Sequence, residues 1–368
     1  MKAIIAFLLL VVISILFFTG IFVGHYQIFP FQVLQEFNKL ITPPILPEIH
    51  DSSIEISSLV HIDNMTNVFN LRSELINYIW SDKEYPLEKY PQVISNISDF
   101  RYADLSNLQR IDKIEHVMEF DVNSIGYHFI PKESNNKLII YHQGHGGDFF
   151  IGKKTIEFFL DNGYSVLAFT MPLVGMNDTP NYSDPDLGNI KLKFHSDLSL
   201  LESSNFNPIK LFFEPLVLSL NYIDLEYNYQ NYYMVGISGG GWTAVIYPAI
   251  DTRIKESYSI AGSVPFIFRN LDKNYGDYEQ RLGELYRITN YFDLYLMAGS
   301  GEERKFVQIF NKFDPCCFSG DYQIYEDDLK QIMQNLEGEF DMIIDDTHKE
   351  HKISDFTLEY IKNSIEQN

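Results

Sequence analysis

The pattern of apolar and polar positions along the chain predicts strands and helices that alternate from residue 137 to residue 365. Short apolar runs predict buried strands, and apolar residues spaced three and four apart predict helices. The expected strands are 137–141, 164–170, 232–237, 253–261, 293–298 and 340–344, and the expected helices are 149–160, 243–250, 327–336 and 355–365. This alternation predicts an α/β fold whose mostly parallel sheet carries helices on both faces.

Four further segments complete this outline. Residues 67–80 have apolar positions at helical spacing, and residues 114–131 alternate apolar with polar residues around a central turn. We expect a helix in the first and an antiparallel pair at a sheet edge in the second. Residues 173–229 and 264–291 are too long for simple connections. We expect these two insertions either to roof a pocket or to add packing helices.

The N-terminus carries an almost unbroken apolar run over residues 3–24, preceded by Lys2. About 20 such residues can cross a bilayer as a helix. We predict a transmembrane anchor at 1–24, with a cleaved signal segment as the alternative, a proline-containing spacer at 25–66 and a globular domain at 67–368. The positive-inside rule puts that domain on the non-cytoplasmic side, and cleavage of the segment would make it a secreted protein.

Composition and charge exclude one class of partner. The 368 residues are 45% hydrophobic, which provides ample material for a core. The chain has 28 Lys and Arg against 50 Asp and Glu, for a formal net charge of -22. Because phosphate binding needs concentrated positive charge, we expect no nucleic-acid partner. The two cysteines, Cys316 and Cys317, are adjacent and fit either a strained bridge or two free thiols.

The motif that carries the chemistry is Gly236-Ile237-Ser238-Gly239-Gly240, between a predicted strand and a predicted helix. It fits G-x-S-x-G, a sharp strand-to-helix turn in which flanking side chains would collide. Such a turn raises the serine hydroxyl above the sheet, so we predict that Ser238 is a nucleophile. The N-terminus of the following helix offers free N–H groups, including that of Gly239, to a developing oxyanion.

A second glycine-rich turn follows the strand at 137–141. Its Gly146 and Gly147 let the backbone direct N–H groups toward the same oxyanion, so we expect them to complete the hole with the N–H of Gly239. His142 and His145 in this turn have H-x-x-H spacing. With no third ligand nearby in the sequence, that spacing is a weak zinc signal, and we predict neither a metal ion nor an organic cofactor.

A serine nucleophile needs a base and an acid that orients the base. Asp314 lies between the predicted strand at 293–298 and the next helix, where the acid is expected; Glu302 and Glu303 are competitors. His351 lies between the last predicted strand and the last helix, and we prefer it over His348 as the base, since an imidazole there can reach the serine.

Over residues 114–366 the chain resembles the α/β-hydrolase superfamily. The resemblance rests on the G-x-S-x-G motif, on the glycine-rich turn and on the order Ser238, Asp314, His351. It implies a sheet of about eight strands and a serine hydrolase that cleaves a small-molecule carboxylic ester through an acyl-enzyme. The same machinery fits a peptidase or amidase, and a hydrolase-like surface binding protein without activity is a further alternative.

Overall fold

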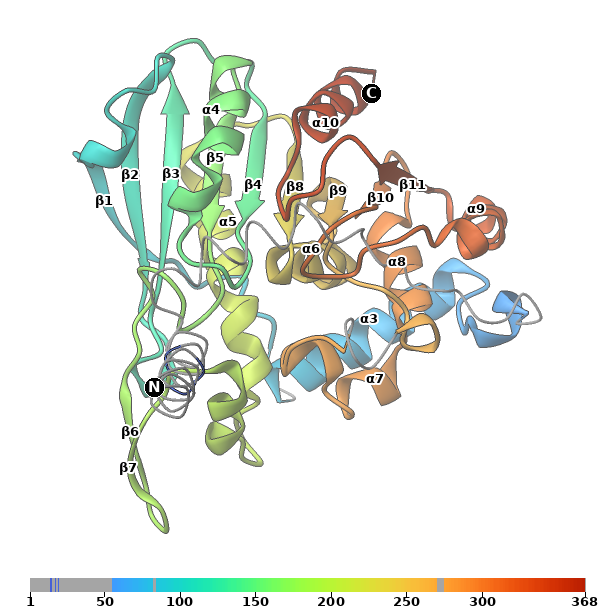
Figure 1. Cartoon of the computed structure of the whole chain (residues 1–368), viewed down its shortest axis with the longest axis horizontal. Coiled ribbons are helices and arrows are strands. Elements are labelled where there is room, and N and C mark those ends of the chain that lie inside the picture. The colour runs from blue at the N-terminus through green and yellow to red at the C-terminus, as the bar shows by residue number, and fades with distance from the viewer. Residues whose placement is uncertain are drawn as a thin grey trace, which may run out of the picture. The chain divides into compact units, whose positions relative to one another are not determined.

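A nine-stranded sheet forms the centre of the computed structural model, which describes residues 55–81, 84–269 and 275–367 together with Ser14, Phe17 and Thr19 (Figure 1). The strand order is β1-β2-β3-β5-β4-β8-β9-β10-β11. The strands are β1 (Gln92–Ile97), β2 (Leu108–His116), β3 (Ser124–Pro131), β4 (Leu138–His142), β5 (Ser165–Phe169), β8 (Tyr232–Ile237), β9 (Ile254–Ile260), β10 (Lys305–Asn311) and β11 (Glu339–Asp345).

Strand direction divides this sheet into two parts. From β5 to β11 every neighbouring pair is parallel, whereas β1, β2 and β3 join through antiparallel pairs. The predicted antiparallel pair is present as β2 and β3, but not within the predicted bounds: β2 lies mostly before residue 114, and Ser124 and Gly126, expected in the turn, lie in β3. The edge strand β1 was not predicted, so the sheet has nine strands where eight were expected. The parallel strands share one carboxyl edge, where their following loops converge.

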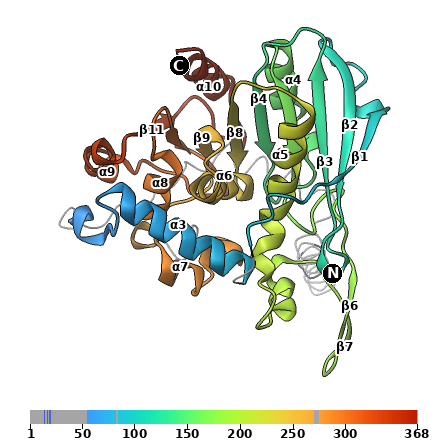
Figure 2. The same ribbon diagram turned by 180° about the vertical axis from the view of Figure 1, so that it is seen from behind.

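Helices cover both faces of the sheet, as the alternating pattern predicted (Figures 1 and 2). On one face, α4 and α10 pack against the strands; on the other lie α5, α6 and α8, with α3 packed on α6. The helices are α3 (Met65–Trp80), α4 (Lys153–Asp161), α5 (Glu214–Glu226), α6 (Gly239–Ile250), α7 (Leu285–Ile288), α8 (Tyr291–Gly299), α9 (Glu326–Met333) and α10 (Asp355–Gln367).

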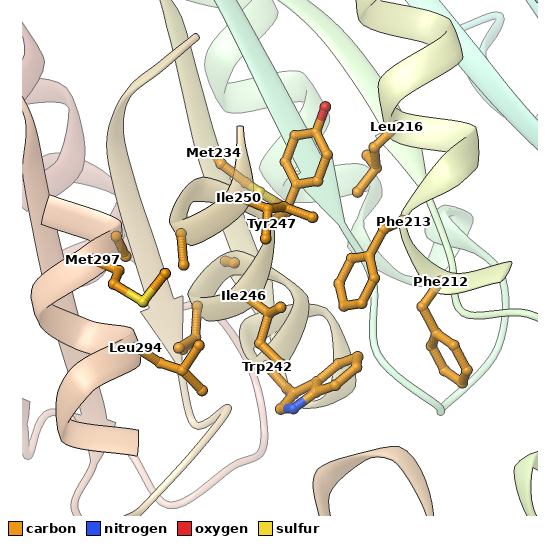
Figure 3. Close-up of a cluster of buried hydrophobic side chains, with 14 of the residues drawn as sticks. Phe212, Phe213, Leu216, Met234, Trp242, Ile246, Tyr247, Ile250, Leu294 and Met297 are labelled. Carbon is orange, nitrogen blue, oxygen red and sulfur yellow. The ribbon is translucent and has the colours of Figure 1, made fainter. Parts of the chain in front are cut away.

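The hydrophobic core is split by the sheet because successive strand residues point to opposite faces. In β4, Ile140 packs with the α6 side, whereas Ile139 and Tyr141 pack with the α4 and α10 side. Figure 3 shows the α6 side, where Trp242 of α6 and Phe213 lie with their ring centroids 5.4 Å apart. A strand buried on both faces is apolar at consecutive positions, which is how the sequence reads here.

One predicted strand is wrong. Residues 293–298 lie in the helix α8, and the strand at this point in the chain is β10, at Lys305–Asn311. All nine residues of α8 are buried, so no polar face gives the helical period, and a short apolar run alone does not separate strand from helix. The strand that precedes Asp314 therefore ends at Asn311, three residues before the proposed acid.

The two insertions contain short elements rather than complete domains. The first holds the hairpin β6 (Asn181–Asp184) and β7 (Gly188–Lys191), the 3₁₀ helices η5 (His195–Leu201) and η6 (Pro208–Phe212), and α5. The second holds η7 (Phe266–Phe268), η8 (Glu279–Arg281) and α7. Both supply buried residues to the core, such as Leu198 and Leu285.

The continuously described chain begins at residue 55, within the predicted spacer. Ile56 and Ile62 are buried in the core, and the backbone N–H of His61 donates to Asp293 Oδ1 at 2.8 Å. Within the described ranges, no helix combines the length and apolar character needed to cross a membrane. Apart from Ser14, Phe17 and Thr19, the predicted anchor at 1–24 lies outside the described residues.

Candidate active site

Ser238 follows the last residue of β8 and occupies the N-cap position of α6, without a capping hydrogen bond from its side chain. Its backbone has φ 59° and ψ -124°, a strained conformation for a residue with a side chain. The flanking glycines make the turn possible: a Cβ on Gly236 would lie 2.0 Å from the Gly240 carbonyl oxygen, and one on Gly240 would lie 2.0 Å from that of His142. The turn therefore has the geometry that G-x-S-x-G predicts.

The Ser238 side chain is partly exposed, and its hydroxyl has no hydrogen-bond partner among the described residues. Catalytic hydrogen bonds are often long before substrate binds, so this geometry is compatible with a nucleophile. The side chain lies against Gly144, because a Cβ built there would be 3.0 Å from Ser238 Oγ. Because Gly144 has no side chain, the space beside the Ser238 hydroxyl stays open.

Asp314 and His351 form a direct pair. His351 Nδ1 and Asp314 Oδ2 are 2.6 Å apart, and the carboxylate side chain is fully buried while the imidazole is 27% exposed. The other carboxylate oxygen, Oδ1, accepts from the backbone N–H of Cys316 at 2.7 Å and of Cys317 at 3.2 Å. These two cysteines are joined by a disulfide, which answers the question that the sequence left open. Asp314 is thus held in one orientation, with Oδ2 facing the imidazole.

The competing acids and the competing base lie elsewhere. Glu302 and Glu303 are exposed in the turn before β10, at the opposite end of that strand from Asp314. His348 Nε2 lies 3.4 Å from Asp345 Oδ2, so this histidine is directed to a different carboxylate. Of the residues proposed as acid and base, the structure brings together Asp314 and His351.

Polar contacts fix the loop that carries His351. Asn311 Nδ2 donates to the Lys352 carbonyl oxygen at 2.9 Å, which ties the end of β10 to this loop. At its base, buried Asp345 accepts hydrogen bonds from Thr347 and from the hydroxyls of Ser354 and Thr357. Burial alone would raise the pKa of the Asp345 carboxyl, but these hydrogen bonds and His348 lower it well below its usual value.

The predicted oxyanion residues lie in the two turns beside Ser238. Gly239 is the first residue of α6, where backbone N–H groups have no partner within the helix. In the turn after β4, a Cβ on Gly146 or Gly147 would face Ile151 rather than the serine. Gly144 is the glycine of that turn that lies against the nucleophile, and the sequence did not single it out.

A second polar cluster adjoins the first. His145 lies over Gly239, since a Cβ there would be 2.4 Å from the His145 ring. Its Nε2 is 2.9 Å from Glu279 Oε1, and His195 Nδ1 is 2.8 Å from Glu279 Oε2. Burial would raise the pKa of Glu279, but the two histidines lower it to about 2. Sequence reasoning missed His195 and Glu279 because each lies in a different insertion, with no local motif.

Comparison with solved structures shows the fold. An acetyl xylan esterase from Paenibacillus sp. R4 aligns with a TM-score of 0.56 at 15% identity, over 85% of this chain and 99% of its own. A glucuronoyl esterase from Solibacter usitatus aligns with a TM-score of 0.55 at 11% identity, over 89% of this chain and 98% of its own. No family model and no curated sequence matches the chain. The chain has the α/β-hydrolase fold.

Proposed function

We propose that the protein is a serine hydrolase that cleaves a small-molecule carboxylic ester through an acyl-enzyme. The observation that carries this proposal is the 2.6 Å pair of Asp314 and His351, which lies at the same sheet edge as the strained Ser238 turn. A buried carboxylate aimed at one imidazole nitrogen fixes the ring and leaves the other nitrogen free to act as a base. The ester-cleaving activities in the names of both structural neighbours favour the same class of substrate.

The proposed reaction has two halves. In the first, His351 Nε2 takes the proton of the Ser238 hydroxyl as Oγ attacks the ester carbonyl, and the imidazolium then gives that proton to the departing alcohol. In the second, His351 takes a proton from water, which attacks the acyl-serine and releases the acid. Asp314 stabilises the imidazolium in both halves. Backbone N–H groups of Gly239 and of the turn that contains Gly146 and Gly147 stabilise each oxyanion.

Ester hydrolysis by the full-length protein tests this function. We expect release of p-nitrophenol from p-nitrophenyl acetate, and loss of that activity by at least about 10³-fold in Ser238→Ala. Ser199→Ala, at an exposed serine of η5, is the matched control and should keep the wild-type rate. If p-nitroanilides of amino acids are cleaved faster than esters, the peptidase alternative holds. Failure of folded protein to cleave either substrate would favour a binding protein.

The apolar run at 3–24 motivates a proposal about location. We propose that this segment anchors the protein in a membrane, with the hydrolase domain on the non-cytoplasmic side. Protease treatment of intact cells, followed by detection of the domain, tests the proposal. Protection of the domain from an external protease that cleaves it in lysed cells would contradict it.

A further inference from the structure

Three chain segments converge on one cluster of ligating side chains beside the nucleophile turn. His145 belongs to the turn after β4, His195 opens η5 in the first insertion, and Glu279 opens η8 in the second. One nitrogen of each imidazole and a carboxylate oxygen of Glu279 lie within 4.8 Å of one another. Glu279 is fully buried, so its charge needs a cationic partner at close range.

The outward nitrogen of His195 has a hydrogen-bond acceptor, and that of His145 lies near a carboxylate. His195 Nε2 lies 2.9 Å from the Pro172 carbonyl oxygen, and His145 Nδ1 lies 3.4 Å from Asp277 Oδ2. Histidines that bind metals almost always donate their second ring N–H to a carbonyl or carboxylate in this way, since that bond fixes the tautomer. Without a metal, the inward nitrogens, Nε2 of His145 and Nδ1 of His195, donate to Glu279. In the metal-binding tautomer these same nitrogens would carry the lone pairs that bind the ion.

We propose that His145, His195 and Glu279 bind one Zn²⁺ ion, with water as the fourth ligand. Two imidazoles and one carboxylate are a ligand set that binds zinc in proteins. Mg²⁺ and Ca²⁺ prefer oxygen ligands, so two imidazole nitrogens make binding of either ion unfavourable. The His145 side chain is 26% exposed, which leaves a side open for the water. The adjacent pair of cysteines is joined in a disulfide and offers no thiolate to compete for the ion.

Binding requires a small outward movement of the ligands. The two nitrogen–oxygen distances are 2.9 and 2.8 Å, as in hydrogen bonds. Zinc bonds of about 2.0–2.1 Å in a tetrahedron separate neighbouring ligand atoms by about 3.3 Å. Each nitrogen therefore has to move about 0.4–0.5 Å away from the carboxylate oxygen that it faces now. The ion then joins both insertions to the turn that lies against Ser238 and Gly239. This zinc site is separate from the proposed ester hydrolysis, whose mechanism uses no metal.

Metal titration of the full-length protein tests the site. The protein is treated with a chelator and then titrated with Zn²⁺ against a chromophoric chelator, without reductant so that the disulfide stays intact. We expect one equivalent to bind, and His195→Asn and Glu279→Gln to weaken binding by more than about 100-fold. His351→Asn, at a histidine outside the cluster, is the control and should bind like wild type.

Cobalt gives a readout that depends on no variant. Co²⁺ bound to the wild-type protein should show the intense visible absorption of a four-coordinate site, without the near-ultraviolet band of a thiolate ligand. Absence of one-equivalent binding, or a weak six-coordinate spectrum, would overturn the proposal. It is also overturned if His351→Asn loses the ion while His195→Asn keeps it. None of these readouts depends on ester hydrolysis, so the two proposals fail separately.

Discussion

Replacing Asp314 with asparagine tests the acid of the proposed triad, because the structure fixes which way the new amide points. Asp314 Oδ1 accepts from the backbone N–H groups of Cys316 and Cys317, so the asparagine oxygen takes that place. The amide NH₂ then faces His351 Nδ1, where Oδ2 lies now. The opposite orientation would set NH₂ against two backbone N–H donors at 2.7 and 3.2 Å and cost about 1–3 kcal/mol or more, whereas the expected one faces a single long contact, Asn311 Nδ2 at 3.4 Å.

This orientation changes the tautomer of the base. An NH₂ group at Nδ1 makes that nitrogen an acceptor, so the His351 proton moves to Nε2, which can no longer take a proton from Ser238. The matching change in a serine-protease triad lowers kcat about 10⁴-fold, equivalent to about 5.5 kcal/mol of transition-state stabilisation. We expect Asp314→Asn to lower kcat/KM for p-nitrophenyl acetate by about 10³- to 10⁴-fold.

Two measurements make this prediction decisive. Asp346→Asn, at an exposed carboxylate on the His351 loop, is the control and should stay within about twofold of wild type. Circular dichroism and thermal unfolding check that Asp314→Asn is folded. If the folded variant keeps more than a tenth of the wild-type kcat/KM, then another group orients the imidazole and the assignment of Asp314 is refuted.

Three further predictions follow from the described contacts. Gly236→Ala should abolish hydrolysis and lower the free energy of unfolding by at least about 1–3 kcal/mol in urea titrations, since its Cβ meets a carbonyl oxygen at 2.0 Å; a wild-type rate would contradict the turn geometry. His348→Asn should hydrolyse esters within about twofold of wild type, and His351→Asn should lose about 10³-fold or more, in parallel assays; the reverse order would exchange the two histidines. Burial lowers the pKa of His116 to about 4 and that of His128 to about 3. Both histidines bind protons more readily in the unfolded chain than in the folded protein. The free energy of unfolding is therefore highest above about pH 6.5, and each histidine lowers it by about 2 kcal/mol at pH 5. Urea unfolding at pH 7 and pH 5 measures this loss, and equal values at the two pH values would contradict it.

Local signals predicted most of the sheet and the elements around it. Strands such as β8 and β11 are short apolar runs bounded by turn residues, and helices such as α10 carry the 3.6-residue period. The prediction failed at α8, where burial on all sides removes that period. It also missed β1, none of whose six residues is buried, because an exposed edge strand has no buried side to mark it.

The candidate site likewise contains some residues that the sequence could predict and others that it could not. Ser238, Asp314 and His351 could be proposed because each follows a strand in a loop of distinctive composition, and chain order supplied the roles. Glu302 and Glu303 competed with Asp314 because the strand before them was placed at 293–298. The strand β10 lies between them and Asp314 and ends at Asn311, three residues before the acid. His195 and Glu279 could not be found, since their partnership with His145 arises only when two insertions fold onto one turn.

The most direct test of the central claim is to find which residue a fluorophosphonate modifies. The reagent phosphonylates a serine only when a neighbouring base activates it, so peptide mass spectrometry of the treated full-length protein reports on the whole site. We predict a single phosphonyl group on the peptide that contains Ser238, formed at least about 10³-fold more slowly in His351→Asn. An unmodified Ser238 in folded, ester-cleaving protein, or a phosphonyl group on another residue, would contradict the account.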